Sequence, residues 1–132
     1  VHVIPIQGGL AKRVTFENVN VKVHGWTDDS KVLYSYNGRV GPTGNWTLKR
    51  VDPTTLIATT IPLADAVEGS IASNGKTLYF TQFGLQISND NARNYQGGAK
   101  GELWRFTLGS NKEATRLTSK HQGSARTPMP YE

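Results

Sequence analysis

The feature that most constrains the fold of this chain is a strand pattern that returns after 45 residues. Asp-Asp-Ser-Lys-Val-Leu-Tyr at 28–34 and Ser-Asn-Gly-Lys-Thr-Leu-Tyr at 73–79 share a polar turn followed by Lys-x-Leu-Tyr. Two further matches keep the same order along the chain: 48–51 with 103–106, and 11–15 with 114–118. Self-similarity of this kind is typical of repeat architectures, so the sequence predicts a structural unit that occurs more than once.

The residues inside each unit favour strands over helices. Val19, Val21 and Val23 alternate with polar residues, which is the period of a half-buried strand. Lys31 to Asn37 is dense in β-branched and aromatic residues, typical of a strand buried on both faces. Turn-forming residues separate these segments, and the sequence lacks the 3.6-residue apolar period of an amphipathic helix. We therefore predict an all-β chain.

A unit of about 45 residues with four strands is typical of a β-propeller blade. We predict about two four-stranded antiparallel blades, a fragment of a ring, because a closed propeller has about four to eight. The expected boundaries are an outer strand at about 11–16, a first blade at about 19–63, a second blade at about 68–119 and the start of a third at 124–132. The ragged ends of the chain, which opens in mid-strand, indicate a piece of a longer protein.

Two blades alone are expected to expose sheet faces that neighbouring blades would cover in a ring. A blade cannot bury both faces by itself, and each large apolar side chain left in water forgoes about 1.5–3 kcal/mol of burial energy. We therefore expect the chain to associate with itself through its blade faces or its unpaired outer strands.

Charge and composition exclude several classes of partner. The chain has 15 Lys and Arg against 10 Asp and Glu, a net charge of +5, but these residues are scattered rather than clustered. Scattered cations are typical of solvated strand faces, so we expect no nucleic-acid partner. The sequence has no apolar run of about 18 residues, so no membrane-spanning helix is expected. Without Cys there is no evidence on redox compartment, and cytoplasmic and periplasmic locations both stay open.

The sequence offers no catalytic residue, cofactor site or metal site. The three histidines, His2, His24 and His121, have no metal-ligand spacing, and no Ser lies in a Gly-x-Ser-x-Gly nucleophile elbow. We expect His24 to face solvent or to cap a strand. Asp28 and Asp29 lie in a predicted turn, where such side chains bond backbone amides. Asp65 and Glu68 are expected to cap a strand or to join neighbouring blades.

A long polar and glycine-rich loop precedes the strand at 102–108. It lacks the spacing of a phosphate-binding loop, so its glycines are expected to allow positive φ. Long loops between propeller strands lie on one rim, where binding sites concentrate. If the chain contacts a peptide or a sister domain, we expect Arg93, Tyr95 and Lys100 to take part.

Residues 95–104 resemble a segment of the Tricorn-type serine peptidases. Their Tyr-x-Gly-Gly-x-x-Gly-x-x-Trp pattern is found in the first, six-bladed propeller of that family. Residues 121–128 are similar to the next blade junction of the family. Residues 25–31 are similar to its aromatic-x-x-Asp-Gly turn, with Ser30 in place of the usual glycine.

The resemblance implies a propeller segment without catalytic residues, because the catalytic Ser and His of such peptidases lie in a distant C-terminal domain. It implies that the ring gates or guides peptides to that domain, which makes the parent protein a serine peptidase. The alternative is a TolB-like propeller module that binds a protein partner and has no enzymatic activity. The sequence beyond Glu132 would discriminate between the two.

Overall fold

The strands of this protein form antiparallel sheets joined in chain order. The computed structural model describes residues 1–38, 45–83 and 97–131, and among these it contains strands and turns but no helix. Two of the sheets have four strands each. The prediction of an all-β chain with four-stranded antiparallel sheets is confirmed.

A two-stranded sheet comes first, formed by β1 (His2–Val3) and β2 (Lys12–Arg13). The first four-stranded sheet contains β3 (Val21–Trp26), β4 (Val32–Tyr36), β5 (Thr47–Val51) and β6 (Ala58–Thr60). The second contains β7 (Ala66–Ile71), β8 (Thr77–Gln82), β9 (Glu102–Thr107) and β10 (Thr115–Arg116). Each is a meander in which every strand pairs with the next along the chain. Consequently β3 and β7 each have one edge without a strand partner among the described residues.

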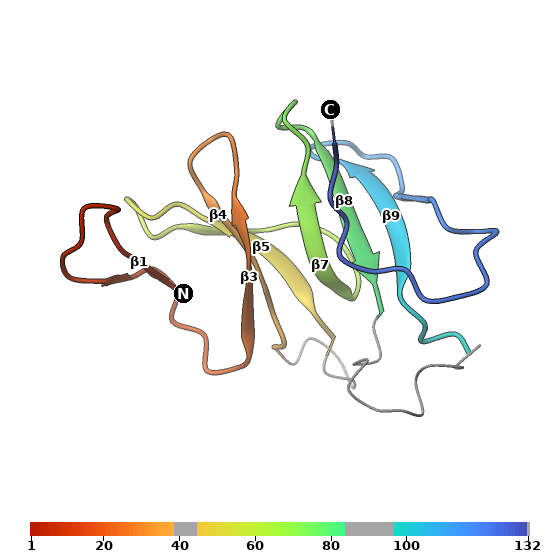
Figure 1. The fold of residues 1–132 in the computed structure, drawn as a ribbon, viewed down its shortest axis with the longest axis horizontal. Helices are drawn as coiled ribbons and strands as arrows, with labels where there is room; N and C mark the ends of the chain where they lie inside the picture. Colours follow the sequence, from red (N-terminus) through yellow and green to blue (C-terminus); the bar gives the residue numbers. More distant parts are fainter. Residues whose placement is uncertain (39–44, 84–96, 132) are drawn as a thin grey trace.

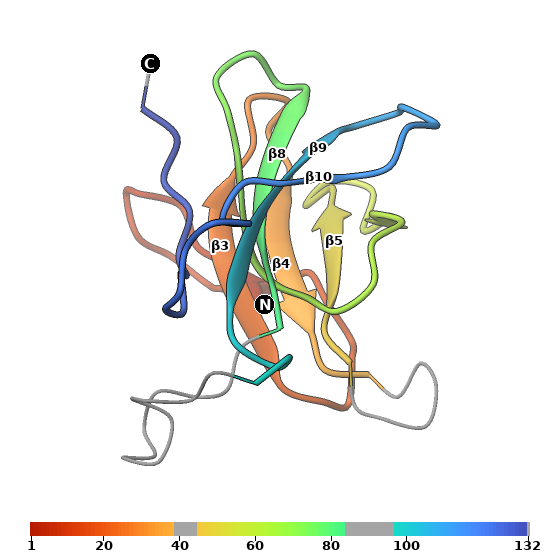
Figure 2. The same cartoon turned by 90° about the vertical axis from the view of Figure 1, so that its right-hand side faces the viewer.

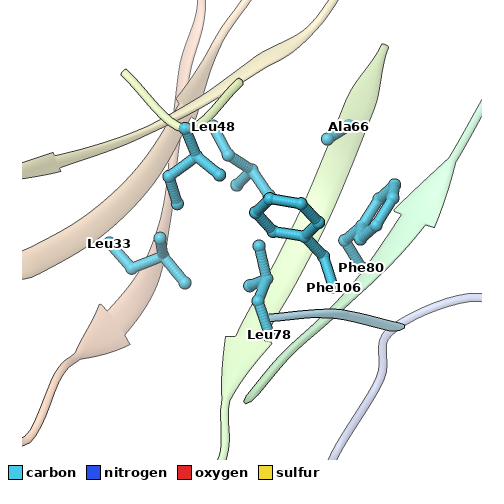
Figure 3. Close-up of a cluster of buried hydrophobic side chains, with 7 residues drawn as sticks. Leu33, Leu48, Ala66, Leu78, Phe80 and Phe106 are labelled. Atoms are coloured by element: carbon cyan, nitrogen blue, oxygen red, sulfur yellow. The ribbon is translucent and has the colours of Figure 1, made fainter. Parts of the chain in front are cut away.

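The two large sheets pack face to face and enclose the main core. Leu33 and Leu48 of the first sheet meet Leu78, Phe80 and Phe106 of the second, and these side chains point toward one another between the sheets (Figure 3). Gly69 of β7 permits the close approach, because a Cβ added there would lie 2.9 Å from a methyl of Leu48. Figure 1 shows β1, the first sheet and the second sheet following one another across the molecule.

A second core lies on the other face of the first sheet. Val32, Tyr34 and Val51 are buried there against Val14, with Val1 and Val3 of the N-terminal segment packed around them. The N-terminal segment therefore covers the face that the second sheet does not. This arrangement explains why β4 is buried on both sides, as its composition predicts.

The repeat survives in the structure, but with a shift of one residue. In the first sheet the turn after β3 closes with a hydrogen bond from Thr27 N to Lys31 O, whereas in the second Ala72 N bonds Thr77 O. The second turn is one residue longer, so the alternation of side chains is offset after it. Tyr34 corresponds structurally to Phe80, and not to Tyr79 as the sequence match suggests.

Both turns place a residue in the left-handed region at the same point. Ser30 has a φ of 59° and Gly75 a φ of 65°. Ser30 therefore adopts the conformation that a glycine adopts at the matching point of the second sheet. This conformation is higher in energy for serine than for glycine because the serine Cβ approaches the backbone.

The outward face of the second sheet is more polar than the sequence suggests. Tyr79 and Arg105 pair across β8 and β9, with Thr77 and Thr107 beside them. A shallow cleft of about 270 Å³ lies over these residues. Large apolar side chains are exposed elsewhere, at both ends of the chain: Ile6 and Leu10 are each 95% exposed, and Met129 is 84% exposed.

Candidate functional site

A groove of about 530 Å³ runs along the edges of β3 and β7, where the two large sheets meet. Its walls come from three segments that are distant in sequence: Lys22, Val23 and His24 of β3, Glu68, Gly69 and Ser70 of β7, and Thr127, Pro128 and Met129 of the C-terminal segment. Figure 1 shows that C-terminal segment running beside β7, and Figure 2 shows it on the same side of the molecule as β3. We call this feature the edge groove.

Two β-bulges shape the joint behind the edge groove. The pairing of β3 with β4 shifts between Val23 and Gly25, and the pairing of β7 with β8 shifts between Ala66 and Glu68. The extra residues are therefore His24 and Val67. A bulge bends its strand and redirects a side chain or a backbone group. Here the two bulged residues, His24 and Val67, contact the same residue of β4.

Ser35 of β4 connects the two bulges. Its hydroxyl is completely buried and donates to the carbonyl oxygen of Val67 across 2.8 Å. Oγ of Ser35 also lies 2.9 Å from Nε2 of His24. Because the hydroxyl proton is used toward Val67, Nε2 of His24 must carry a hydrogen and donate to Ser35. The relay His24–Ser35–Val67 thus joins β3 and β4 of one sheet to β7 of the other.

His24 departs from its predicted role. We expected a solvent-facing or capping side chain, but His24 lies on the face of β3 that is directed at the second sheet, and it is half-buried against Ser35. Burial lowers the pKa of His24 below its ordinary value of 6.5, the nearby Lys22 lowers it further, and Glu68 partly opposes the change. The imidazole is therefore neutral at neutral pH.

Glu68 ties the C-terminal segment to β7. Its Oε1 accepts from Arg126 Nη2 at 2.6 Å, and its Oε2 accepts from the backbone N–H of Thr127 at 2.8 Å and from the Thr81 hydroxyl at 3.2 Å. Burial alone would raise the pKa of this carboxyl, but the bonds from Arg126 and Thr127 outweigh it and hold the pKa below 4.5. We expected Glu68 to cap a strand or to join neighbouring blades, and it joins β7 to the C-terminal segment.

Equivalent side-chain hydrogen bonds are found just before β7 and within the C-terminal segment. The backbone N–H of Trp46 donates to Oδ1 of Asp65 at 3.0 Å, just before β7 begins. The N–H of Gly101 donates to Oγ of Ser124 at 2.9 Å, just before the C-terminal segment reaches Glu68. Trp46 and Gly101 each precede the third strand of their sheet. The capping role expected for Asp65 is confirmed, and Ser124 repeats it.

The loop residues predicted to bind lie away from this site or beyond the described part of the chain. Arg93 and Tyr95 fall outside the described residues. Lys100 is described, and its Nζ donates to the carbonyl oxygen of His121 at 3.4 Å rather than lining the edge groove. Gly101 does not provide the positive φ expected of the loop glycines. It is buried, and a Cβ added there would lie 2.8 Å from Cγ of Arg126.

Sequence reasoning placed Asp29 correctly in a turn but assigned it the wrong partners. Asp29 accepts from the side chains of Thr27 and Lys31 instead of from backbone amides. The reasoning also missed Ser35 and Arg126. A lone serine inside the apolar run 31–37 was the one available signal for Ser35, because a buried hydroxyl requires a partner.

Comparison with known proteins accounts for this repeated architecture. A family model described as the Tricorn protease N-terminal beta propeller domain matches residues 1–132. The chain belongs to this family. The suspected resemblance to Tricorn-type peptidases is thereby confirmed, and the two large sheets are blades of a Tricorn-type propeller.

Among curated proteins, Tricorn protease homolog 1 of Streptomyces coelicolor is 32% identical over 108 residues. The match covers 79% of this chain and 10% of that relative, so the chain spans about a tenth of the length of the Tricorn homologue. Comparison with solved structures gave no match.

The described part of this Tricorn propeller segment shows neither a metal-binding cluster nor a membrane-spanning helix. Within it, no group of three or more His, Cys, Asp or Glu side chains is placed to hold a metal ion. The same residues contain no helix long and apolar enough to cross a membrane.

Proposed function

We propose that this chain is a non-catalytic part of the propeller of a Tricorn-like serine protease and that its edge groove guides peptides to a catalytic domain outside this chain. The observation that carries the proposal is the groove itself, which lies between the free edges of the innermost strands β3 and β7. Free strand edges bind extended chains through backbone hydrogen bonds, without regard to most side chains. Such binding suits a passage that must accept many peptide sequences.

The same geometry supports a division of the chain into successive blades. We propose an outer strand at about 11–16, blades at about 19–63 and 68–119, and the inner strand of a third blade within 124–132. The support is the repeated cap, because Ser124 stands before the C-terminal segment as Asp65 stands before β7. Under this division, β3, β7 and the C-terminal segment are consecutive inner strands that surround one channel.

The family match gives this proposal support that the TolB-like alternative lacks. The discriminating observation is the reading frame that follows Glu132. A further propeller, a PDZ-like module and a serine nucleophile would fit a protease, whereas a stop after the ring would fit a module that recruits a protein partner.

Site-specific photocrosslinking tests the proposed contact with peptides. A benzophenone amino acid is placed at Val23, which lines the edge groove and is 57% exposed, or at Ile57, which is 66% exposed and lies beside the opposite edge of the same sheet. Each protein is irradiated with a mixed pool of short peptides and analysed by mass spectrometry. We expect adducts at position 23 and few at position 57, with the peptides otherwise intact. Equal labelling at both positions would contradict the proposal.

A hydrolysis assay completes the test. The chain is incubated with fluorogenic peptides after repeated purification, and no turnover is expected because a nucleophile elbow is missing from the sequence. Turnover that persists through purification and tracks with the protein peak would show a catalytic site in this chain and would overturn the non-catalytic role.

A further inference from the structure

The edge groove has an unequal balance of charge. Three ionisable side chains line it, Lys22, His24 and Glu68. Glu68 is occupied by Arg126, Thr127 and Thr81, and its side chain is only 17% exposed. Its negative charge is therefore compensated within the protein and is not available to attract a cation from outside.

Lys22 has no such compensation from the residues that the structure describes. Its Nζ lies 4.6 Å from the centre of the Trp46 ring, a contact that keeps the cation in place without neutralising it. Lys22 is absent from the ion pairs formed by the described residues. One uncompensated positive charge thus faces the groove, between the free edges of two strands.

His24 adds a second charge under acidic conditions. Because Nε2 already donates to Ser35, protonation occurs at Nδ1 and leaves the relay to Val67 in place. The charged groups around the imidazole are Lys22 on its own strand and Glu68 on β7, which is itself bound to Arg126 of the C-terminal segment. Burial lowers the pKa of His24, so this charge develops below pH 6.5.

We propose that the edge groove selects peptide segments that carry carboxylate groups, with Lys22 as the permanent attracting charge and His24 as a second charge that strengthens binding in mild acid. This inference rests on the proposed guiding of peptides and adds the chemistry of the preferred peptide. Apolar residues of the groove, Val23, Pro128 and Met129, contact the peptide side chains next to the carboxylate. The free edges of β3 and β7 supply backbone partners for an extended segment.

Fluorescence anisotropy with matched peptides tests the inference. Three labelled peptides of equal length with amidated C-termini carry Asp, Asn or Lys at their central positions, and each is titrated with the 132-residue chain. We expect the Asp peptide to bind about fivefold more tightly than the Asn peptide, the effect of one partly exposed ion pair, and the Lys peptide to bind most weakly. Added salt should reduce the difference.

Two charge-matched variants assign the effect to the groove. Lys22→Gln should abolish the preference for Asp over Asn, whereas Lys76→Gln, which removes the same charge from an exposed turn, should leave it unchanged. Between about pH 8 and pH 5.5 the affinity for the Asp peptide should rise in the wild type and stay level in His24→Gln. Circular dichroism confirms that each variant is folded.

The outcomes separate this inference from the function on which it rests. Equal binding of the Asp and Asn peptides, or equal losses in the two lysine variants, would overturn carboxylate selection while leaving peptide guiding intact. Absence of binding by all three peptides would overturn both.

Discussion

The buried hydroxyl of Ser35 should hold the joint between the two large sheets, and its removal tests this directly. In Ser35→Ala the carbonyl of Val67, a residue only 2% exposed, loses its side-chain donor. The N–H of His24 loses its acceptor at the same time. A buried polar group left without a partner costs about 1–3 kcal/mol. Water can reach half-buried His24 more easily than Val67, so we expect a total loss of about 2 kcal/mol.

Urea denaturation followed by circular dichroism measures the loss, with Ser70→Ala as the matched control. Ser70 is also on an inner strand and is half-buried, but no hydrogen bond of its hydroxyl is found in the described structure. The control should change the free energy of unfolding by less than about 0.5 kcal/mol. A chain of this size loses roughly 3–5 °C in melting temperature per kcal/mol, so Ser35→Ala should melt roughly 6–10 °C lower. Equal and small effects of the two substitutions would refute the role given to the relay.

Four further outcomes are expected. Gly69→Ala should destabilise the fold by about 1–3 kcal/mol in urea titrations because its Cβ would lie 2.9 Å from fully buried Leu48; a neutral effect would show that the sheets can separate. Ser30→Gly should raise stability by roughly 0.5–1 kcal/mol by relieving a positive φ of 59°, and a lower melting temperature would contradict this. Glu68→Gln should lower the free energy of unfolding by about 2 kcal/mol at neutral pH. The difference in stability from wild type should vanish as pH falls below 4.5, because the fold lowers the pKa of Glu68 by stabilising its ionised form, which protonation removes. A difference independent of pH would disprove the ion pair with Arg126. Light scattering at micromolar concentration should detect self-association, weakened by Ile6→Asp with Leu10→Asp, and a monomer at every dilution would rule it out.

The strands could be predicted from sequence because their cause is local. Alternation, β-branched runs and turn residues are visible within a few positions, and the left-handed conformation of Ser30 follows from its place in a glycine turn. The match of 48–51 with 103–106 also holds in three dimensions, since Leu48 and Leu103 occupy the same position opposite Ser35 and Thr81.

The edge groove could not be predicted because its causes are not local. One additional residue in the turn after β7 exchanged the two faces of the following strands, so the identical Lys-x-Leu-Tyr motifs lie in different environments. Alternation places His24 on the same face of β3 as Lys22, but that face is directed at the second sheet and not at solvent, which no local pattern indicates. The hydrogen bond between Glu68 and Arg126 joins residues 58 positions apart, and no pattern in the sequence predicts it.

The attachment of residues 124–127 to β7 and Gly101 has a consequence for modularity. Each large sheet is bound by the first residues of the segment that follows it. Asp65 bonds Trp46 of the first sheet, and Ser124 and Arg126 bond Gly101 and Glu68 of the second. A cut at the end of β10 would leave the partly buried carboxylate of Glu68 without its counter-ion. A working module for transplantation, duplication or recombination therefore includes the sheet and the first residues of the segment that follows it. Gene duplication that respected this overlap would produce repeats whose borders fall after the residues that bond back to the preceding sheet, and not at the end of its last strand.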